Sequence, residues 1–345
     1  MSQVLKVFSI FILMYTADAL QCLNENGSPV DWAYVYKLPR SEKSDNELIK
    51  KGVAYIYMTS DKIRWTLSKF GIDDDASILS KHIKIHLEKK DDLTHLVYND
   101  VLPNGEENKT AGHTKGLILA DSDGGLWATG TIPGYPGPDM TYPEIGKIKG
   151  EFFSCVSMDL KNLDNAGPAL RCREAQIYDS HIATGMEASL PMLSSVIKGE
   201  PSKANATKVK VDFLSSRDGM RVGILSKSSE LNGDIYKKVI GTLVLEDLYV
   251  RSAISKEDGL PSDCKAPRVL NIESIFIKAA GMTIPNEEDN AKWAMGNSFI
   301  GSWICIGDMD RNESEKHRGG GAFCMLSKTV VKQFNKMIRS VEECP

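Results

Sequence analysis

Residues 112–120 read Gly-His-Thr-Lys-Gly-Leu-Ile-Leu-Ala, which places a histidine and a lysine directly in front of an apolar strand. Side chains alternate along an extended chain, so His113 and Lys115 are expected to point to the same side. This pair suits phosphoryl transfer, because an imidazole can attack phosphorus or move a proton while an ammonium neutralises a nonbridging oxygen. The alternative is an ordinary pair of surface side chains, and a lone His-x-Lys motif does not decide between the two.

The segments around this motif predict a chain that mixes strands and helices. Residues 116–120 and 126–132 are predicted to form a hairpin, in which Asp123-Gly124 supplies the positive φ of a tight turn. Residues 32–38 and 53–58 are rich in β-branched and aromatic side chains and are predicted strands.

Two helices are predicted from caps followed by apolar residues at helical spacing. Asp75 is expected to cap the first, whose apolar residues are Ile78, Leu79, Ile83 and Leu87. Ser327 is expected to cap the second, whose apolar stripe is Val330, Val331, Phe334, Met337, Ile338 and Val341. The predicted linkers are Gly134–Pro143 and Lys198–Thr207.

The composition is that of a globular chain without a strong charge bias. It has 345 residues, of which 42% are hydrophobic and 26% charged, so disorder is excluded. Lys and Arg number 42 and Asp and Glu 46, and this net charge of -4 excludes a general nucleic-acid coat. The six histidines gain charge below about pH 6.5, so mild acid would favour a polyanionic partner.

The N-terminus predicts export. Lys6 precedes the apolar run Val7–Tyr15, and Ala17-Asp-Ala19 has the small residues of a cleavage site, so residues 1–19 are a predicted signal peptide. An uncleaved membrane anchor is the alternative, but the run is far shorter than the ~20 residues that a bilayer requires. The sequons at Asn26, Asn108, Asn205 and Asn312 fit a secreted glycoprotein, or alternatively a lysosomal one. Seven cysteines suggest three disulfides and one free thiol, with the pairing open.

Motifs along the whole mature chain resemble those of deoxyribonuclease II, a branch of the phospholipase D superfamily. They are Pro29-Val-Asp-Trp32, Val35-Tyr-Lys-Leu-Pro39, Val97-Tyr-Asn-Asp100, Gly112-His-Thr-Lys-Gly116, Asp123-Gly-Gly125, Leu260-Pro-Ser-Asp-Cys264, Lys292-Trp293, Cys305-Ile-Gly-Asp-Met309, Arg311-Asn312 and Arg318-Gly-Gly-Gly321.

The resemblance implies an α+β, phospholipase-D-like fold with two similar halves, roughly residues 20–200 and 201–345, each with a mixed β-sheet flanked by helices. It also implies that one His-x-Lys motif from each half meets over a single phosphate. The resemblance implies no metal or cofactor. It further implies that DNA is cleaved at acid pH to 3′-phosphate ends through a phosphohistidine. The implied disulfides are Cys22–Cys155, Cys264–Cys344 and Cys305–Cys324, which leave Cys172 reduced or paired between chains.

The second motif departs from this family pattern. Two residues before Lys292 the chain has Asn290 where the family has its second histidine. An amide neither attacks phosphorus usefully nor carries a proton near neutral pH, although it can hydrogen-bond a phosphate oxygen. We therefore expect DNA hydrolysis to be lost or strongly impaired.

The other histidines offer weaker candidates. His317 is a candidate substitute for the missing histidine, and the alternative is an exposed turn residue. His82 and His86 share one helical face, which we expect to be solvated rather than a metal site. His95 and His181 lie in no motif. The glycines of Arg318–Gly321 suggest either a turn between strands, which we favour, or a phosphate-binding nest.

The sequence thus predicts a secreted deoxyribonuclease-II-like glycoprotein with a degenerate catalytic site, formed by His113, Lys115 and Lys292. The alternative is an active acid endonuclease that uses His113 alone or with a substitute base. DNA is the expected partner, bound weakly and better in acid, and no membrane is expected. A homodimer and a protein partner are left open.

Overall fold

The computed structural model describes residues 20–137, 141–201, 207–297 and 301–344. Its first sheet has eight strands in the described part of the chain, in the order β10-β6-β7-β8-β9-β3-β4-β5. These strands are β3 (Trp32–Lys37), β4 (Tyr55–Thr59), β5 (Lys62–Leu67), β6 (Thr94–Tyr98), β7 (Gly116–Asp121), β8 (Gly124–Gly130), β9 (Glu151–Met158) and β10 (Ile177–His181). The accompanying helices are α1 (Glu47–Lys50), α2 (Ile78–Lys89), η1 (Glu144–Lys147), α3 (Leu160–Leu163), α4 (Ala166–Cys172) and α5 (Pro191–Ile197).

The second sheet runs in the order β11-β12-β18-β17-β16-β13-β14-β15, and β19 pairs with β14. Its strands are β11 (Val209–Ser215), β12 (Arg221–Lys227), β13 (Leu248–Arg251), β14 (Val269–Ile277), β15 (Met282–Pro285), β16 (Trp293–Gly296), β17 (Trp303–Gly307), β18 (Gly320–Leu326) and β19 (Ile338–Val341). Its helices are η2 (Ser229–Leu231), η3 (Tyr236–Ile240), α6 (Gly241–Val244), η4 (Lys278–Ala280), η5 (Asn286–Glu288), η6 (Ser314–His317) and α7 (Lys328–Asn335). A small separate ribbon joins β1 (Cys22–Leu23) to β2 (Pro29–Val30).

The two sheets share one arrangement of strands, which confirms the α+β fold with two similar halves. The expected mixed sheet is found in the second half, where β13 and β14 are parallel, but not in the first, whose described strand pairs are all antiparallel. The order β6-β7-β8-β9-β3-β4 in the first corresponds to β13-β16-β17-β18-β12-β11 in the second, and every pair along both series is antiparallel. Lys115 directly precedes β7, and Lys292 directly precedes the corresponding strand, β16. The expected boundary at residues 200/201 falls between the last strand of one sheet and the first of the other.

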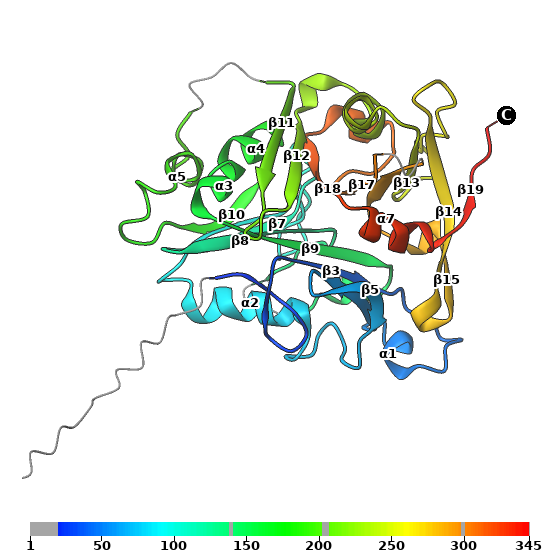
Figure 1. The fold of residues 1–345 in the computed structure, drawn as a ribbon, viewed down its shortest axis with the longest axis horizontal. Helices are drawn as coiled ribbons and strands as arrows, with labels where there is room; N and C mark the ends of the chain where they lie inside the picture. The colour runs from blue at the N-terminus through cyan, green and yellow to red at the C-terminus, as the bar shows by residue number, and fades with distance from the viewer. Residues whose placement is uncertain (1–19, 138–140, 202–206, 298–300, 345) are drawn as a thin grey trace, which may run out of the picture.

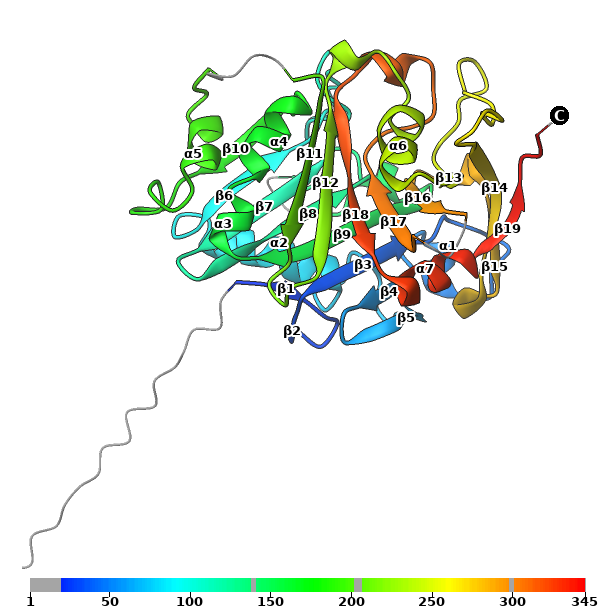
Figure 2. The same cartoon turned by 45° about the horizontal axis from the view of Figure 1, so that its top comes forward.

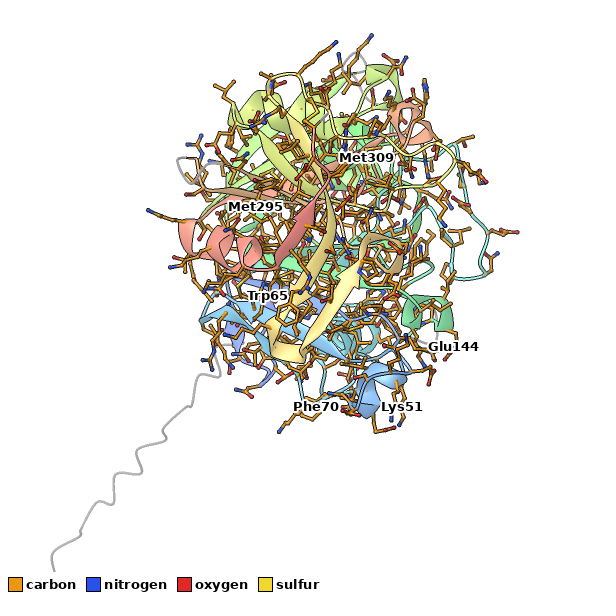
Figure 3. The ribbon with its side chains drawn as sticks, turned by 90° about the vertical axis from the view of Figure 1, so that its right-hand side faces the viewer. Lys51, Trp65, Phe70, Glu144, Met295 and Met309 are labelled. Atoms are coloured by element: carbon orange, nitrogen blue, oxygen red, sulfur yellow. A yellow bond between two sulfur atoms is a disulfide. The ribbon has the colours of Figure 1, made fainter. Side chains whose placement is uncertain are left out.

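One hydrophobic core joins the two sheets. Aromatic pairs contact across it, with Trp127 4.7 Å from Phe323 and Tyr34 6.1 Å from Phe334, measured between ring centroids. Figure 1 shows α2 below the first sheet and α3, α4 and α5 above it, while Figure 2 shows β12, β18 and β17 of the second sheet side by side. At the edge seen in Figure 3, Trp65 of β5 lies below Met295 of β16, and both belong to this core. Burial of so much apolar surface is the main force that holds the halves together.

Helix α2 covers the outer face of the first sheet but differs from the prediction in two respects. Its N-cap is Ser77 rather than Asp75, because the Ser77 hydroxyl accepts the backbone N–H of Ser80 at 3.0 Å. Leu87, predicted to be part of the apolar face, is 40% exposed.

The hairpin and the last helix also differ in detail. Asp121 pairs with Gly124, so Ser122 and Asp123 form the turn, and Gly124 is the strand residue with positive φ, at 152°. Ser327 caps α7 as predicted, but α7 ends at Asn335. Ile338 and Val341 therefore lie on strand β19 and not on the predicted helical stripe.

Three disulfides join Cys22 to Cys155, Cys264 to Cys344 and Cys305 to Cys324, the pairs that the resemblance implies. Cys172 is a buried free thiol. The predicted signal peptide, residues 1–19, lies outside the described residues. Within the described ranges, none of the helices has the length and apolar character needed to span a membrane.

Candidate active site

His113 lies in the loop that leads into β7 and contacts the second sheet on two sides. Its backbone N–H donates to the carbonyl of Gly319 at 2.8 Å, which pins the loop to the start of β18. Its Nδ1 lies 2.9 Å from Oε1 of Glu315 in η6, a charge contact in which the N–H bond is poorly aligned with the oxygen. The side chain is 15% exposed, so its ring reaches solvent while a carboxylate lies behind it.

Lys115 is nearly buried and is ion-paired with Asp100, the residue two positions after β6. Arg318 donates to the other oxygen of the same carboxylate at 2.8 Å and also approaches Glu315 at 3.4 Å. Burial acts to raise the pKa of Asp100, but the charges of Lys115 and His113 outweigh it and hold that pKa well below its ordinary value. Lys115 is thus held in an ion pair and does not project freely into solvent.

Thr114, between the two motif residues, anchors the loop through a buried network around Asp308. The Asp308 carboxylate accepts Thr114 Oγ1 at 2.7 Å and Thr129 Oγ1 at 2.9 Å. Arg173 donates to it at 3.2 Å from a fully buried guanidinium. This network joins the loop that carries His113 and Lys115 to the loop after β17 of the second sheet through buried hydrogen bonds.

Asn290 and Lys292 occupy the corresponding position in front of β16. The Asn290 backbone N–H donates to the carbonyl of Gly150 at 2.8 Å, and its side-chain amide donates to Oε1 of Glu151 at 2.8 Å. Lys292 Nζ lies 3.2 Å from Asp310 and donates to the Asn290 carbonyl at 3.0 Å. As in the first motif, the lysine is paired with an aspartate of its own half, and the side chain two positions earlier contacts a glutamate of the other half.

The pKa values of Glu151 and Glu315 are shifted in opposite directions. Burial raises the pKa of Glu151 to about 7, although hydrogen bonds from Thr131 and Asn290 act in the opposite direction. Burial also acts to raise the pKa of Glu315, but His113, Arg318 and Lys292 together lower it below its ordinary value. The charged form of Glu315 is therefore favoured beside His113, whereas the neutral form of Glu151 is favoured beside Asn290.

The structure brings His113, Lys115, Asn290 and Lys292 to one junction between the sheets. The charge of Lys292 acts on Glu315 and on Glu151, the carboxylates that contact His113 and Asn290 respectively. Sequence reasoning missed the carboxylates and the arginine around the motifs, which are Asp100, Glu151, Asp310, Glu315 and Arg318. Asp100 and Arg318 stand in the family motifs, but nothing local to Glu151 or Glu315 points to a site in the other half.

The glycines after Arg318 do not form the expected turn. Gly320 and Gly321 begin strand β18. A Cβ at Gly319 would lie 2.2 Å from the carbonyl oxygen of Arg173, and a Cβ at Gly112 would lie 1.7 Å from the same atom. These glycines thus allow two loops to pack closely against Arg173, which is a packing requirement that local sequence does not reveal.

The prediction of a solvated face for His82 and His86 is wrong, because both residues are buried. His82 Nε2 accepts the backbone N–H of Leu23 at 2.9 Å, so the N-terminal segment covers this side of α2. His317 is exposed at the end of η6, where its neighbour Glu315 instead faces His113. His95 lies beside His86 and Asp179, and these three side chains are of the types that bind metal ions.

Comparison with known proteins agrees with this geometry. The sequence model of the family described as Deoxyribonuclease II matches residues 21–344. The chain is 29% identical to deoxyribonuclease-2-alpha of Rattus norvegicus, over 96% of this chain and 97% of that protein. It is 28% identical to plancitoxin-1 of Acanthaster planci, covering 96% and 95%, and 28% identical to deoxyribonuclease-2 of Caenorhabditis elegans, covering 95% of each.

Proposed function

Since the chain belongs to the deoxyribonuclease II family, we propose that it is a DNA-binding member whose metal-independent phosphodiester site has lost most or all of its hydrolytic activity. The observation that carries this proposal is Asn290, which occupies the place of the family's second histidine and donates its amide to Glu151. The family relationship itself supports a nuclease function.

The retained half of the site supports nucleophilic or proton-transfer chemistry. His113 is partly exposed and has the Glu315 carboxylate behind it, so its imidazole reaches solvent beside a negatively charged group. Lys115 and Lys292 supply positive charge for nonbridging phosphate oxygens, as the resemblance implies.

The changed half removes a proton carrier. Turnover needs one group to attack phosphorus and another to protonate the leaving oxygen, and an amide does neither. Losing a general acid or base costs about 10²- to 10⁴-fold in rate, and losing a nucleophile costs more.

Weak DNA binding follows from the way the cations are paired. Lys115 and Lys292 contact Asp100 and Asp310, so much of their charge is offset at neutral pH. Glu151 is the nearby carboxyl group whose pKa burial raises, to about 7, so its protonation in acid would make the site more positive and favour phosphate.

Export through the secretory pathway is part of the proposal, with delivery to lysosomes as the alternative. Disulfides form in oxidising compartments, and three are present. The sequon residues Asn26 and Asn108 are exposed and Asn312 is partly so, which leaves them available for glycosylation, while Asn205 lies outside the described residues.

A second candidate is an active acid endonuclease, favoured by the raised pKa of Glu151, which burial brings to about 7. A protonated carboxyl beside Asn290 would be a proton source in the half that lacks histidine.

Nicking of supercoiled plasmid at pH 5 with chelator present tests the two candidates. The protein should come from a eukaryotic secretory host, with His113→Ala and a catalytically active family member assayed in parallel. The degenerate site predicts a rate at least ~10²-fold below the active relative. Cleavage at a comparable rate that disappears in His113→Ala would establish the acid endonuclease instead.

A further inference from the structure

A group of histidine and carboxylate side chains lies apart from the phosphodiester site, where α2, β6 and β10 meet. His86 comes from α2, His95 from β6 and Asp179 from β10. His86 Nε2 lies 3.4 Å from one oxygen of Asp179, and His95 Nε2 lies 3.3 Å from the other. One atom from each of the three residues lies within 4.8 Å of the other two.

The surroundings of His95 determine which of its two ring nitrogens carries the lone pair that faces the Asp179 carboxylate. Its Nδ1 lies 3.1 Å from the backbone carbonyl of Lys90, and a carbonyl can only accept, so Nδ1 carries a hydrogen. In the neutral ring, Nε2 then has a lone pair that points at Asp179. A histidine whose second nitrogen donates to a backbone carbonyl is the usual arrangement of a metal ligand.

His86 meets the same carboxylate from the other side. Its side chain is 3% exposed, and its Nδ1 is buried without a hydrogen-bond partner among the described residues. The Nε2 atoms of His86 and His95 thus face the two oxygens of one carboxylate, an arrangement that a positive species, either a proton or a cation, would stabilise.

The distances favour a metal ion. Zinc binds histidine nitrogen and carboxylate oxygen at about 2.0–2.1 Å, so two ligands of one tetrahedral ion lie about 3.3–3.4 Å apart. The two nitrogen-to-oxygen distances in this group have that value, although each nitrogen faces a different oxygen of Asp179. Because one atom from each residue lies within 4.8 Å of the other two, side-chain adjustments suffice to bring the three residues around one ion.

An entry path and a fourth ligand position are also present. A cavity of about 250 Å³ is lined by His86 and Asp179, together with Tyr178 and Pro136. His181 pairs with His95 across β10 and β6, and their ring centroids lie 5.9 Å apart. A water molecule from the cavity or the exposed His181 would complete four-coordination.

A second group of metal-binding residue types lacks this capacity. Cys22, His82 and Cys155 also lie close together. The two cysteines form a disulfide, and both nitrogens of His82 are engaged, with Leu23 and with Ile78. The contrast shows that free lone pairs, and not proximity alone, distinguish the group at Asp179.

We propose that His86, His95 and Asp179 form a binding site for a divalent transition cation, zinc being the one that fits best. The ion would fasten α2 to the edge of the first sheet. Asp100, the partner of Lys115, follows β6 by two residues, so the ion would support the strand that leads into the phosphodiester site without contacting phosphate.

Zinc titration of untagged, chelator-treated protein tests this site, with a chromophoric chelator as competitor and Zn²⁺ as the only added metal. We expect one equivalent to bind. Asp179→Asn keeps the shape of this half-exposed side chain but removes its charge. It should weaken zinc binding at least ~10²-fold, which is the upper end of the loss of affinity caused by mutating residues that only hydrogen-bond to a metal ligand. His317→Ala is the matched control, because it removes an exposed histidine elsewhere.

Two further readouts separate binding at this site from other effects. Zinc should raise the melting temperature of the parent protein and of His317→Ala but not that of Asp179→Asn, and Co²⁺ should give the visible absorption of a tetrahedral site only where Asp179 is present. Absence of stoichiometric binding in the parent, or equal affinity in Asp179→Asn, would overturn the proposal and leave a proton between these side chains.

Discussion

The side-chain amide of Asn290 donates a 2.8 Å hydrogen bond to Glu151, a residue that begins a strand of the opposite sheet. His113 also contacts a carboxylate across the two sheets, since its Nδ1 lies 2.9 Å from Oε1 of Glu315, although this contact is not an aligned hydrogen bond. The carboxylate that would orient a second histidine is therefore in place, and the asparagine uses it as an acceptor. The proposed loss of activity is therefore attributed to a single side chain, that of Asn290.

The disulfide assignment predicts a single alkylatable thiol. In nonreduced, unfolded protein, only Cys172 should react, because the other six cysteines are bridged. Intact mass before and after alkylation measures this, and also reports whether the mature chain begins at Leu20. Two or more reactive thiols would contradict the assignment.

DNA affinity is predicted to be weak at neutral pH, to rise as the pH falls toward 5, and to fall with added salt. Protonated histidine and the lysines displace counterions from phosphate, and that exchange is salt-dependent. Lys115→Ala combined with Lys292→Ala should reduce affinity at every pH, measured by fluorescence anisotropy.

This double variant needs two controls, because each lysine is one partner of a buried ion pair. Removing such a partner costs about 3–5 kcal/mol of stability, so circular dichroism must show that the compared samples are folded. Lys84→Ala combined with Lys332→Ala removes the same charge from exposed positions. Equal affinity in the two double variants would place DNA elsewhere on the molecule.

Glu151 is predicted to make stability depend on pH. Burial raises its pKa from 4.5 to about 7, so the folded state binds this proton more tightly than the unfolded state. The resulting stabilisation is fully present below about pH 4.5 and is lost as the pH rises through 7. Glu151→Gln keeps a neutral side chain, so its melting temperature relative to the parent should increase from pH 4.5 to 7.5. A difference that stays constant or decreases would show that Glu151 is ionised throughout.

His317 is predicted to have no part in any acid cleavage that the parent protein shows. It is exposed at the end of η6, whereas Glu315 of the same short helix contacts His113. Plasmid nicking by His317→Ala should therefore equal that of the parent. Loss of chelator-resistant cleavage in this variant would instead identify His317 as the substitute histidine.

Sequence reasoning located the parts of the site that are local in the chain. The alternation of residues along a strand placed His113 and Lys115 in front of β7, and the family motif placed Asn290 and Lys292 in front of β16. The pairing of cysteines came from the resemblance, since composition leaves it open.

What the sequence did not reveal depends on contacts between distant segments. Glu151 and Glu315 act on motifs in the opposite sheet, so only docking of the two halves brings them together. His82 and His86 lie on a helix face that looks polar, but the N-terminal segment and β10 cover it. Gly319 and Gly321 are needed because Arg173 packs against them, and Gly320 because Met309 does, which no local pattern shows.

The central claim, that Asn290 alone separates this site from a working one, is tested most directly by plasmid nicking with Asn290→His at pH 5 in the presence of chelator. The account predicts a gain of at least ~10²-fold, the low end for restoring one proton-transfer group. His113→Ala should abolish the gain. Chelator-resistant acid cleavage by the unmodified protein that is lost in His113→Ala, at a rate that Asn290→His does not improve, would contradict the account.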